Sequence, residues 1–278
     1  MSGKILLESW ALDGKGGGVI LEPERIIEVL DSEQVGWVHL DAGAKGAKAF
    51  LKEKLHFLDD ITISALLAEE TRPRVMQVGE GALVILRGVN LNEAADPEDM
   101  VSLRIWVDAR RIVSLRKRRL KAVSDVREKL QKGEGPKNSG DFLVMMINRV
   151  FDRMEPELDE LEERCDTVEE RIMQHPDISD RHEVIDIRQM AIALRRYVAP
   201  QRDAVAQLKN SDLAFLTTEH RRYLQETHDR AIRHVESLDA IRERAQIVKD
   251  ELANALADKL NRNMYTLSVV ASIFLPLG

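Results

Sequence analysis

The sequence predicts an α+β protein: an N-terminal α/β/α domain with a mixed sheet, then a long helical hairpin and a very long stalk helix. Three observations predict this class. Short β-branched and aromatic runs bounded by glycine occur only up to about residue 130. From Asp141 onward the chain is charged and rich in Ala, Leu and Glu, with almost no strand pattern. Of all residues, 32% are charged and only 4% aromatic, which is typical of long solvated helices.

Residues 1–132 are expected to form the α/β/α domain. The run 35–40 predicts a strand, and Gly14–Gly18 predicts a hairpin turn. Two further hairpins are predicted, 74–86 around Gly79-Glu-Gly81 and 101–115 around Asp108-Ala-Arg110. In 101–107 the period of two places alternate residues on opposite faces: Val101, Leu103, Ile105 and Val107 on one, Ser102, Arg104 and Trp106 on the other.

Two helices are expected in the same domain. Apolar residues at helical spacing predict one helix from Ala47 to about Glu70, which stops before Arg72-Pro73 because a residue preceding proline avoids helical geometry. A shorter helix is predicted from Ala122 to about Lys132. The glycine-containing segment 132–140 then reads as a linker.

The remaining chain is predicted to be helical. Residues 141–209 form the expected hairpin: one helix from Phe142 to Gln174, and a second capped by Ser179 or Asp180 and interrupted and kinked at Pro200. Residues 213–263 form the expected stalk, whose helix begins near Thr217 and meets no proline before Pro276. At about 1.5 Å per residue this helix is roughly 90 Å long, so it must leave the globule or be shared between subunits.

The stalk carries a narrow apolar stripe with steps of three and four residues. Such a stripe indicates helix-to-helix packing. The stripe could pack against another subunit, or against the two preceding helices of the same chain. We expect both kinds of packing, in different segments of the stalk. Its members are Ala231, Val235, Leu238, Ile241, Ala245, Val248, Leu252 and Ala255.

The segment 264–278 contains no charged residue. A membrane-spanning helix needs about 20 such residues, so the segment is either a buried C-terminal helix or an unfinished span. Because it follows a long charged helix without a cap, we expect the start of a first transmembrane helix, truncated in this chain. Lys259 and Arg262 then place the bulk of the chain in the cytoplasm by the positive-inside rule.

Composition and motifs exclude several classes. With 41 basic and 48 acidic residues the net charge is −7, which argues against a nucleic-acid partner. A single cysteine, Cys165, rules out an internal disulfide framework and fits a reducing compartment. The start MSGKILLESW does not read as a signal peptide. Phosphate-loop, Gly-x-Ser-x-Gly and His-Glu-x-x-His motifs are missing from the sequence, so we expect no enzyme.

Two sets of residues carry a family resemblance. The segment Asn261–Leu277 resembles the start of the first transmembrane helix of the CorA superfamily of divalent-cation transporters. The stretches 72–74, 86–92 and 97–106 are similar to the ZntB zinc-transporter branch of that superfamily. The superfamily's Gly-x-Asn motif and second membrane helix would lie beyond Gly278, so this chain is not expected to conduct ions alone.

The resemblance implies a homopentamer whose soluble domains form a cytoplasmic funnel below the cell inner membrane, attached through further C-terminal segments. Zinc or another divalent cation is the implied transported ion, and no cofactor is implied. The implied pore-lining residues share one face of the last helix: Asn261, Met264, Leu267, Ser268, Ala271 and Leu275. None is a usual zinc ligand, so we expect a largely hydrated ion, with Met264 and Leu275 as apolar constrictions or simple packing residues.

Other candidate sites have weaker signals. A basic cluster is expected either to bind an anion or to form salt bridges to the helical hairpin; its candidate anion ligands are Arg110, Arg111, Arg116, Arg118 and Arg119. Candidate metal ligands are His220, His228, Asp229 and Cys165, although no His pair has i, i+4 spacing and a lone thiol usually packs. The alternative function is a soluble coiled-coil scaffold without transport activity.

Overall fold

The computed structural model of the protein describes residues 5–275. In this part of the chain a seven-stranded sheet has the order β2-β1-β3-β7-β6-β5-β4. The pair β3–β7 is parallel and the other neighbours are antiparallel, so the predicted mixed sheet is confirmed. The strands are β1 (Leu6–Leu12), β2 (Gly18–Ile20), β3 (Gly36–Asp41), β4 (Arg74–Val78), β5 (Gly81–Gly88), β6 (Val101–Val107) and β7 (Arg111–Arg116).

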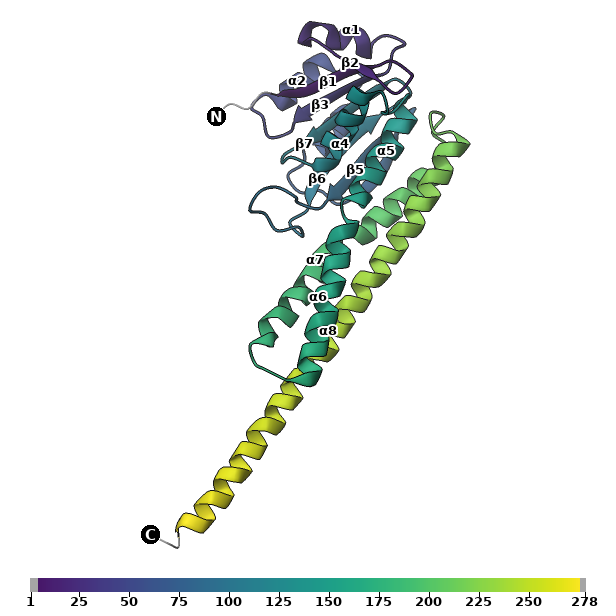
Figure 1. Ribbon diagram of the computed structural model, residues 1–278. Helices are drawn as coiled ribbons and strands as arrows, with labels where there is room; N and C mark the ends of the chain where they lie inside the picture. The colour runs from purple at the N-terminus through teal and green to yellow at the C-terminus, as the bar shows by residue number, and fades with distance from the viewer. Residues whose placement is uncertain (1–4, 276–278) are drawn as a thin grey trace. The chain divides into compact units, whose positions relative to one another are not determined.

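Short helices lie between the strands and directly after them in the chain, and long helices follow (Figure 1). The short ones are η1 (Pro23–Arg25), α1 (Ile26–Leu30), α2 (Ala47–Lys54), α3 (Asp60–Leu67) and α4 (Lys121–Lys132). The long ones are α5 (Ser139–Asp152), α6 (Glu155–Gln174), α7 (Asp180–Lys209) and α8 (Thr218–Phe274). The helical hairpin and the long last helix are therefore present as the sequence predicts.

The two faces of the sheet bury different sets of side chains. Leu103 and Ile105 of β6 belong to a core with α4 and α5, while Trp106 of the same strand belongs to a second core with α1, α2 and α3. The predicted alternation of β6 is confirmed, and so is the α/β/α layering. The turn Gly14–Gly18 does join two antiparallel strands, although the pattern of β1 itself was too weak to predict.

Two segments that were each expected to form one helix form two helices instead. The helix expected over 47–70 is two helices, because Leu55 leaves helical geometry (φ −113°, ψ 65°) and Asp59 starts a new one. Asp59 Oδ1 accepts a hydrogen bond from the Thr62 amide at 2.7 Å, a standard N-cap. The helix expected over 142–174 breaks after Asp152, whose carbonyl cannot receive a helical hydrogen bond from Pro156.

Helix α7 runs through Pro200 without interruption. The prediction that Pro200 interrupts it is wrong. The residue after it, Gln201, is completely buried, and its Oε1 accepts a hydrogen bond from the Arg87 amide of β5 at 2.7 Å. A side chain thus satisfies a backbone donor that strand β4 is too short to reach.

The chain divides into two compact units. The first contains the residues up to Glu157 together with Arg196–Val235, and the second contains Leu158–Arg195 together with the residues from Glu236 onward. The first unit therefore holds the sheet, helices α1–α5 and the adjoining parts of α7 and α8. The second unit is helical only.

The second unit is held by its apolar stripe and by ion pairs. Leu238, Ile241 and Leu252 of α8 are each at most 2% exposed. Arg244 of α8 pairs with Asp166 and Glu169 of α6. The predicted stripe is thus buried within a single chain up to Leu252, as the intramolecular interpretation requires.

Candidate functional site

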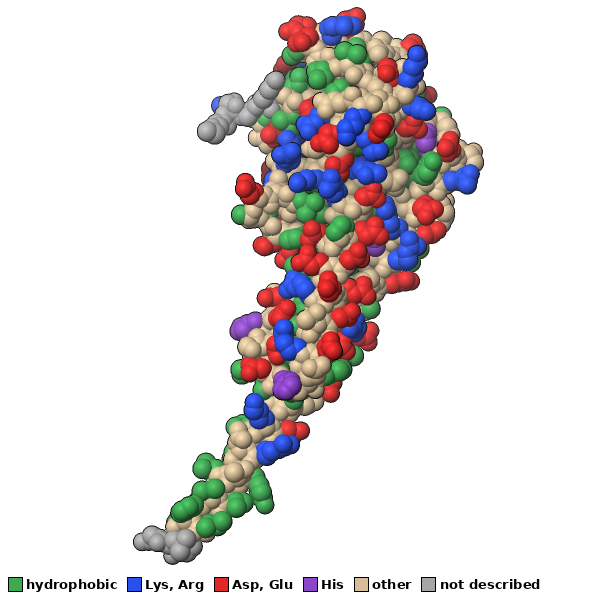
Figure 2. Space-filling model, in the orientation of Figure 1, with side chains coloured by type: hydrophobic (Ala, Val, Ile, Leu, Met, Phe, Trp, Pro, Cys, Tyr) green, Lys and Arg blue, Asp and Glu red, His purple; other side chains and the backbone are tan. Residues whose placement is uncertain are grey.

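The last part of α8 exposes apolar side chains on all sides. Every described residue from Ala257 onward is exposed, and Leu275 is 80% exposed. Figure 2 shows this end of α8 as hydrophobic side chains beyond the last basic ones. Between residues 5 and 275, no helix has both the length and the hydropathy of a membrane span. Large exposed apolar patches mark surfaces that meet a partner or a membrane.

The six implied pore residues lie on this exposed end of α8. At about 100° per residue the six residues fall within an arc of roughly 120° of the helix. They can therefore all face the same central axis. The remaining arc carries Tyr265, Val269 and Ile273. Residues 276–278 of the expected transmembrane start lie outside the described residues.

Three hydroxyl groups on this end bond back to their own helix. Thr266 donates to the Arg262 carbonyl at 2.9 Å, Ser268 to the Met264 carbonyl at 2.9 Å, and Ser272 to the Ser268 carbonyl at 2.8 Å. An unpaired hydroxyl in an apolar medium costs several kcal/mol, and these bonds remove that cost. These three hydroxyl groups are therefore compatible with an apolar environment. These bonds are not among the predictions from the sequence, although a Ser or Thr inside any helix can reach the carbonyl four residues before it.

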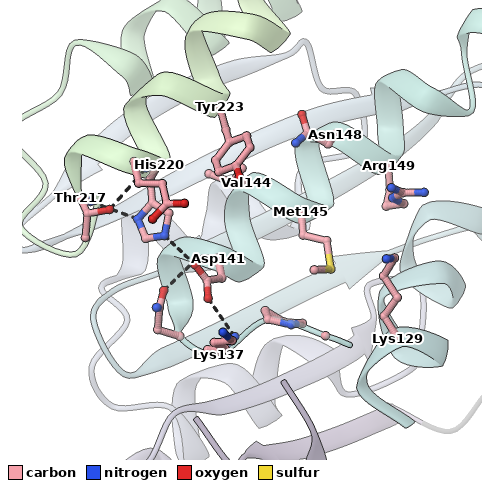
Figure 3. A pocket seen from close by; sticks show the side chains of 14 residues that line it. Lys129, Lys137, Asp141, Val144, Met145, Asn148, Arg149, Thr217, His220 and Tyr223 are labelled. Carbon is pink, nitrogen blue, oxygen red and sulfur yellow. Dashed lines mark hydrogen bonds and ion pairs between the residues drawn. The ribbon is translucent and has the colours of Figure 1, made fainter. Parts of the chain in front are cut away.

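His220 lines a cavity of about 710 Å³ between the end of α4, the first half of α5 and the first turns of α8 (Figure 3). Its Nε2 lies 2.7 Å from Asp141 Oδ1 of α5. Its Nδ1 accepts a hydrogen bond from the Thr217 amide, while Thr217 Oγ1 accepts one from the His220 amide at 3.4 Å. This is a reciprocal capping box with histidine at the third helical position.

The hydrogen bonds of His220 use both ring nitrogens. Because Nδ1 is an acceptor, Nε2 carries the ring proton and donates a hydrogen bond to Asp141. A metal ion needs a free nitrogen lone pair, so ligation at His220 would break the cap of α8 or the link to α5. Gly140 allows this arrangement, since a Cβ there would lie 2.3 Å from the imidazole.

The other candidate metal ligands do not assemble. His228 Nδ1 is 3.6 Å from its neighbour Asp229, and Cys165 is buried in the second unit, where burial raises the pKa of its thiol. Among the described side chains no three His, Cys, Asp or Glu residues form a group that could hold a metal. The geometry thus gives no support to a metal site at His220, His228, Asp229 or Cys165.

The basic cluster is largely paired within the α/β part of the chain. The ion pairs that the described residues form in this cluster do not go to the helical hairpin, so the expected salt bridges to the hairpin are wrong. Arg116 is half-buried, and burial lowers the pKa of its guanidinium despite the nearby carboxylate of Glu8. The backbone carbonyl of Arg119 accepts a hydrogen bond from Asn92 Nδ2 at 3.0 Å. The ion pairs are Arg110–Glu33, Arg111–Asp108, Lys117–Glu69 and Arg118–Asp99.

A buried arginine is the main feature that the sequence did not indicate. Arg104 is 1% exposed and donates to Ser102 Oγ and to the Leu66 carbonyl, with no carboxylate bonded to it. Desolvation lowers the pKa of its guanidinium, and so does the neighbouring charge of Arg87. The alternation of β6 placed Arg104 with Trp106 on the face opposite the apolar residues, and it did not indicate that this second face is buried as well.

The His220–Asp141 contact predicts a measurable coupling. Asp141→Ala and His220→Ala should each lower the free energy of unfolding by about 1–2 kcal/mol, because each removes one partner of the bond and leaves the other, partly buried, without it. The double variant should be more stable than the sum of the single losses predicts, by about 1 kcal/mol. Urea unfolding of the four proteins measures this coupling. The exposed His56→Gln variant serves as the control, and strictly additive losses would contradict the contact.

The sequence of the chain is similar to those of known divalent-cation transporters. The chain is 37% identical over 277 residues to the divalent cation transporter CmaX of Pseudomonas aeruginosa, covering 98% of this chain and 83% of the relative. It is 34% identical over 268 residues to the zinc transport protein ZntB of Yersinia enterocolitica, covering 96% of this chain and 80% of the relative.

The fold comparison extends over the whole described chain. The structure of full-length CmaX matches with a TM-score of 0.91 at 37% identity, covering 100% of this chain and 86% of the other. The ZntB cytoplasmic domain of Vibrio parahaemolyticus matches in fold with a TM-score of 0.79 at 23% identity, covering 92% of this chain and all of the other. The model of the family described as CorA-like Mg2+ transporter protein matches residues 32–278. The chain is therefore a member of the CorA-like Mg2+ transporter family, as the resemblance implied.

Proposed function

We propose that this chain is the cytoplasmic part of a membrane transporter for divalent metal cations, with zinc as the first ion to test. The relatives named above as divalent cation and zinc transporters support this proposal, since each aligns with at least 96% of the chain. The family is one of transporters and not of enzymes.

The exposed, uncharged end of α8 is the observation that carries the proposal. Its apolar side chains are exposed in the described chain, and the hydroxyl groups of Thr266, Ser268 and Ser272 are satisfied within the helix. Insertion into a bilayer would remove this apolar surface from water. Lys259 and Arg262 directly precede the segment, which favours the cytoplasmic side of the inner membrane for the preceding residues.

Self-association follows from the same segment. We expect five copies of α8 around an axis, with the face from Asn261 to Leu275 turned inward. This face offers an amide, a hydroxyl and apolar groups to the ion, and none of them is a strong zinc ligand. The ion therefore keeps most of its water while it passes Met264 and Leu275.

The coiled-coil scaffold alternative loses its main support. The stripe that indicated a seam with another chain is buried inside this one from Val235 to Leu252. The described residues from Ala257 to Leu275 are all exposed, and we expect other copies to pack against this part of α8.

Reconstitution tests the proposal directly. The full-length protein in liposomes that contain a zinc-sensitive dye should give protein-dependent zinc entry, measured with and without a proton gradient. Magnesium, nickel and cadmium in parallel liposomes define selectivity, and light scattering of the purified protein gives the number of copies. If none of these ions crosses above the rate of protein-free liposomes, the proposal is wrong.

A further inference from the structure

The cavity beside His220 has a size and a position that suit a bound small molecule. Its volume of about 710 Å³ lies within the range of roughly 300–1,000 Å³ that is typical of ligand pockets. All of its lining residues belong to the first unit. They come from the end of α4, the segment before α5, the first half of α5 and the start of α8. The cavity is therefore formed within one compact part of the chain.

Three basic side chains line this cavity with little neutralising charge. Lys129 of α4 and Lys137 before α5 form no ion pair within the described part of the chain. Arg149 of α5 lies 3.2 Å from Asp152, but that carboxylate is shared with Arg230 at 2.7 Å. The Nε of Arg149 is buried and has no hydrogen-bond partner among the described residues. The cavity therefore has donors and positive charge available for a ligand.

The carboxylates that line the cavity belong to the end beside His220. Asp141 already binds through both oxygens, since Oδ1 lies 2.7 Å from His220 Nε2 and Oδ2 accepts a bond from a backbone amide at 3.0 Å. Glu219 is the neighbour of His220 on the first turn of α8 and is exposed to water, which screens its charge. Figure 3 shows Lys129 and Arg149 at the other end of the cavity. A negative group is therefore favoured at that second end.

Between its two ends the cavity is lined by apolar and aromatic groups. Val144 is 6% exposed and Met145 is partly buried, and both belong to α5. Tyr223 of α8 also lines the cavity and is 52% exposed. A flat ring system can stack on such a tyrosine, and a methionine adapts its shape to an apolar neighbour. An inorganic anion alone would leave this part of the cavity unused.

We propose that the cavity binds a nucleoside diphosphate or triphosphate. The phosphates lie against Lys129 and Arg149, with Lys137 as a further cation, and the base lies against Tyr223 and Met145. A guanidinium binds two phosphate oxygens at once, and lysine supplies a compact charge beside it. Because the ligand contacts α4, α5 and α8 together, its binding stabilises the first unit. The inference goes beyond the proposed function and does not depend on it.

Three probes separate the contributions of charge and ring. The full-length protein in detergent is titrated calorimetrically with ATP, with tripolyphosphate and with adenosine, in EDTA so that no divalent ion bridges the contact. We expect a dissociation constant below about 1 mM for ATP, and binding at least about tenfold weaker for each of the other two probes. ATP should also raise the midpoint of thermal unfolding. The absence of saturable ATP binding overturns the inference, and equal affinity for ATP and tripolyphosphate does so too, because the ring then contributes nothing.

Matched variants locate the site. Lys129→Gln and Arg149→Gln should each weaken ATP binding about tenfold, because each removes a charge-assisted hydrogen bond. Tyr223→Ala should weaken ATP binding by a similar factor and leave tripolyphosphate binding unchanged. Lys132→Gln is the control, since Lys132 is exposed one turn further along α4 and does not line the cavity. If Lys132→Gln weakens ATP binding as much as Lys129→Gln, ATP binds to surface charge and not in the cavity, and the inference is wrong.

Discussion

The free energy of unfolding of the His39→Gln variant is expected to change little between pH 6.5 and 4.5, whereas the unsubstituted protein should lose about 2 kcal/mol over this range. His39 lies on β3 and is 1% exposed. Burial, assisted by the positive charge of Arg116, lowers the pKa of its imidazole from 6.5 to about 3, although a hydrogen bond with Ser114 acts in the opposite direction.

The sign follows from proton uptake. Below pH 6.5 the unfolded chain binds a proton at His39 and the folded protein does not, so falling pH favours unfolding. The stabilising effect is complete above pH 6.5 and is lost progressively as pH falls toward 3. Carboxylates such as Asp59 and Asp99, whose pKa values are lowered in the fold mainly by hydrogen bonds from Thr62 and Arg118, lose their contribution only below about pH 4.

Urea unfolding at half-unit pH steps measures the effect. His39→Gln can be less stable at neutral pH, since Ser114 Oγ lies 2.8 Å from the imidazole Nδ1 and also accepts a bond from Trp37 Nε1. The slope with pH is therefore the quantity to compare. The exposed His56→Gln variant should keep the slope of the unsubstituted protein. Equal slopes in all three proteins would show that His39 is not buried in its neutral form.

His39 also shows which part of the fold the sequence can predict. A run such as 35–40 predicts a strand, because β-branched and aromatic residues bounded by glycines are typical of strands. The run does not reveal that His39 meets Ser114, which is 75 residues away, since that contact depends on the parallel pairing of β3 with β7. Strand order is a tertiary property, and local propensity does not contain it.

The same distinction applies to the helices and to the candidate sites. Periodicity predicted α8 and its stripe because the pattern repeats over many turns. It failed at Leu55 and Asp152, where one residue ends a helix and the apolar spacing continues. The pore face could be assigned from helical spacing alone. The role of His220 could not, because Asp141 reaches it from another helix.

Substituting the two proposed apolar constrictions should change transport most strongly. Met264→Ser and Leu275→Ser in the full-length protein are expected to raise zinc leak into dye-loaded liposomes by roughly tenfold, because a hydroxyl keeps water in a narrow apolar pore that would otherwise dewet. Both side chains lie on the proposed inner face, at 60% and 80% exposure in the single chain. Leak without a proton gradient is the quantity to measure.

The control variant lies on the opposite side of the same helix. Val269 is 40% exposed and points about 140° away from Met264, so Val269→Ser removes a similar apolar group from the proposed outer face. It should leave the leak unchanged. If all three variants leak equally, the effect comes from weaker packing between copies of α8, and a drop in the pentamer fraction by light scattering should accompany it. A leak confined to Met264→Ser and Leu275→Ser, with the pentamer intact, requires that these two side chains face the ion path, because only that position separates them from Val269.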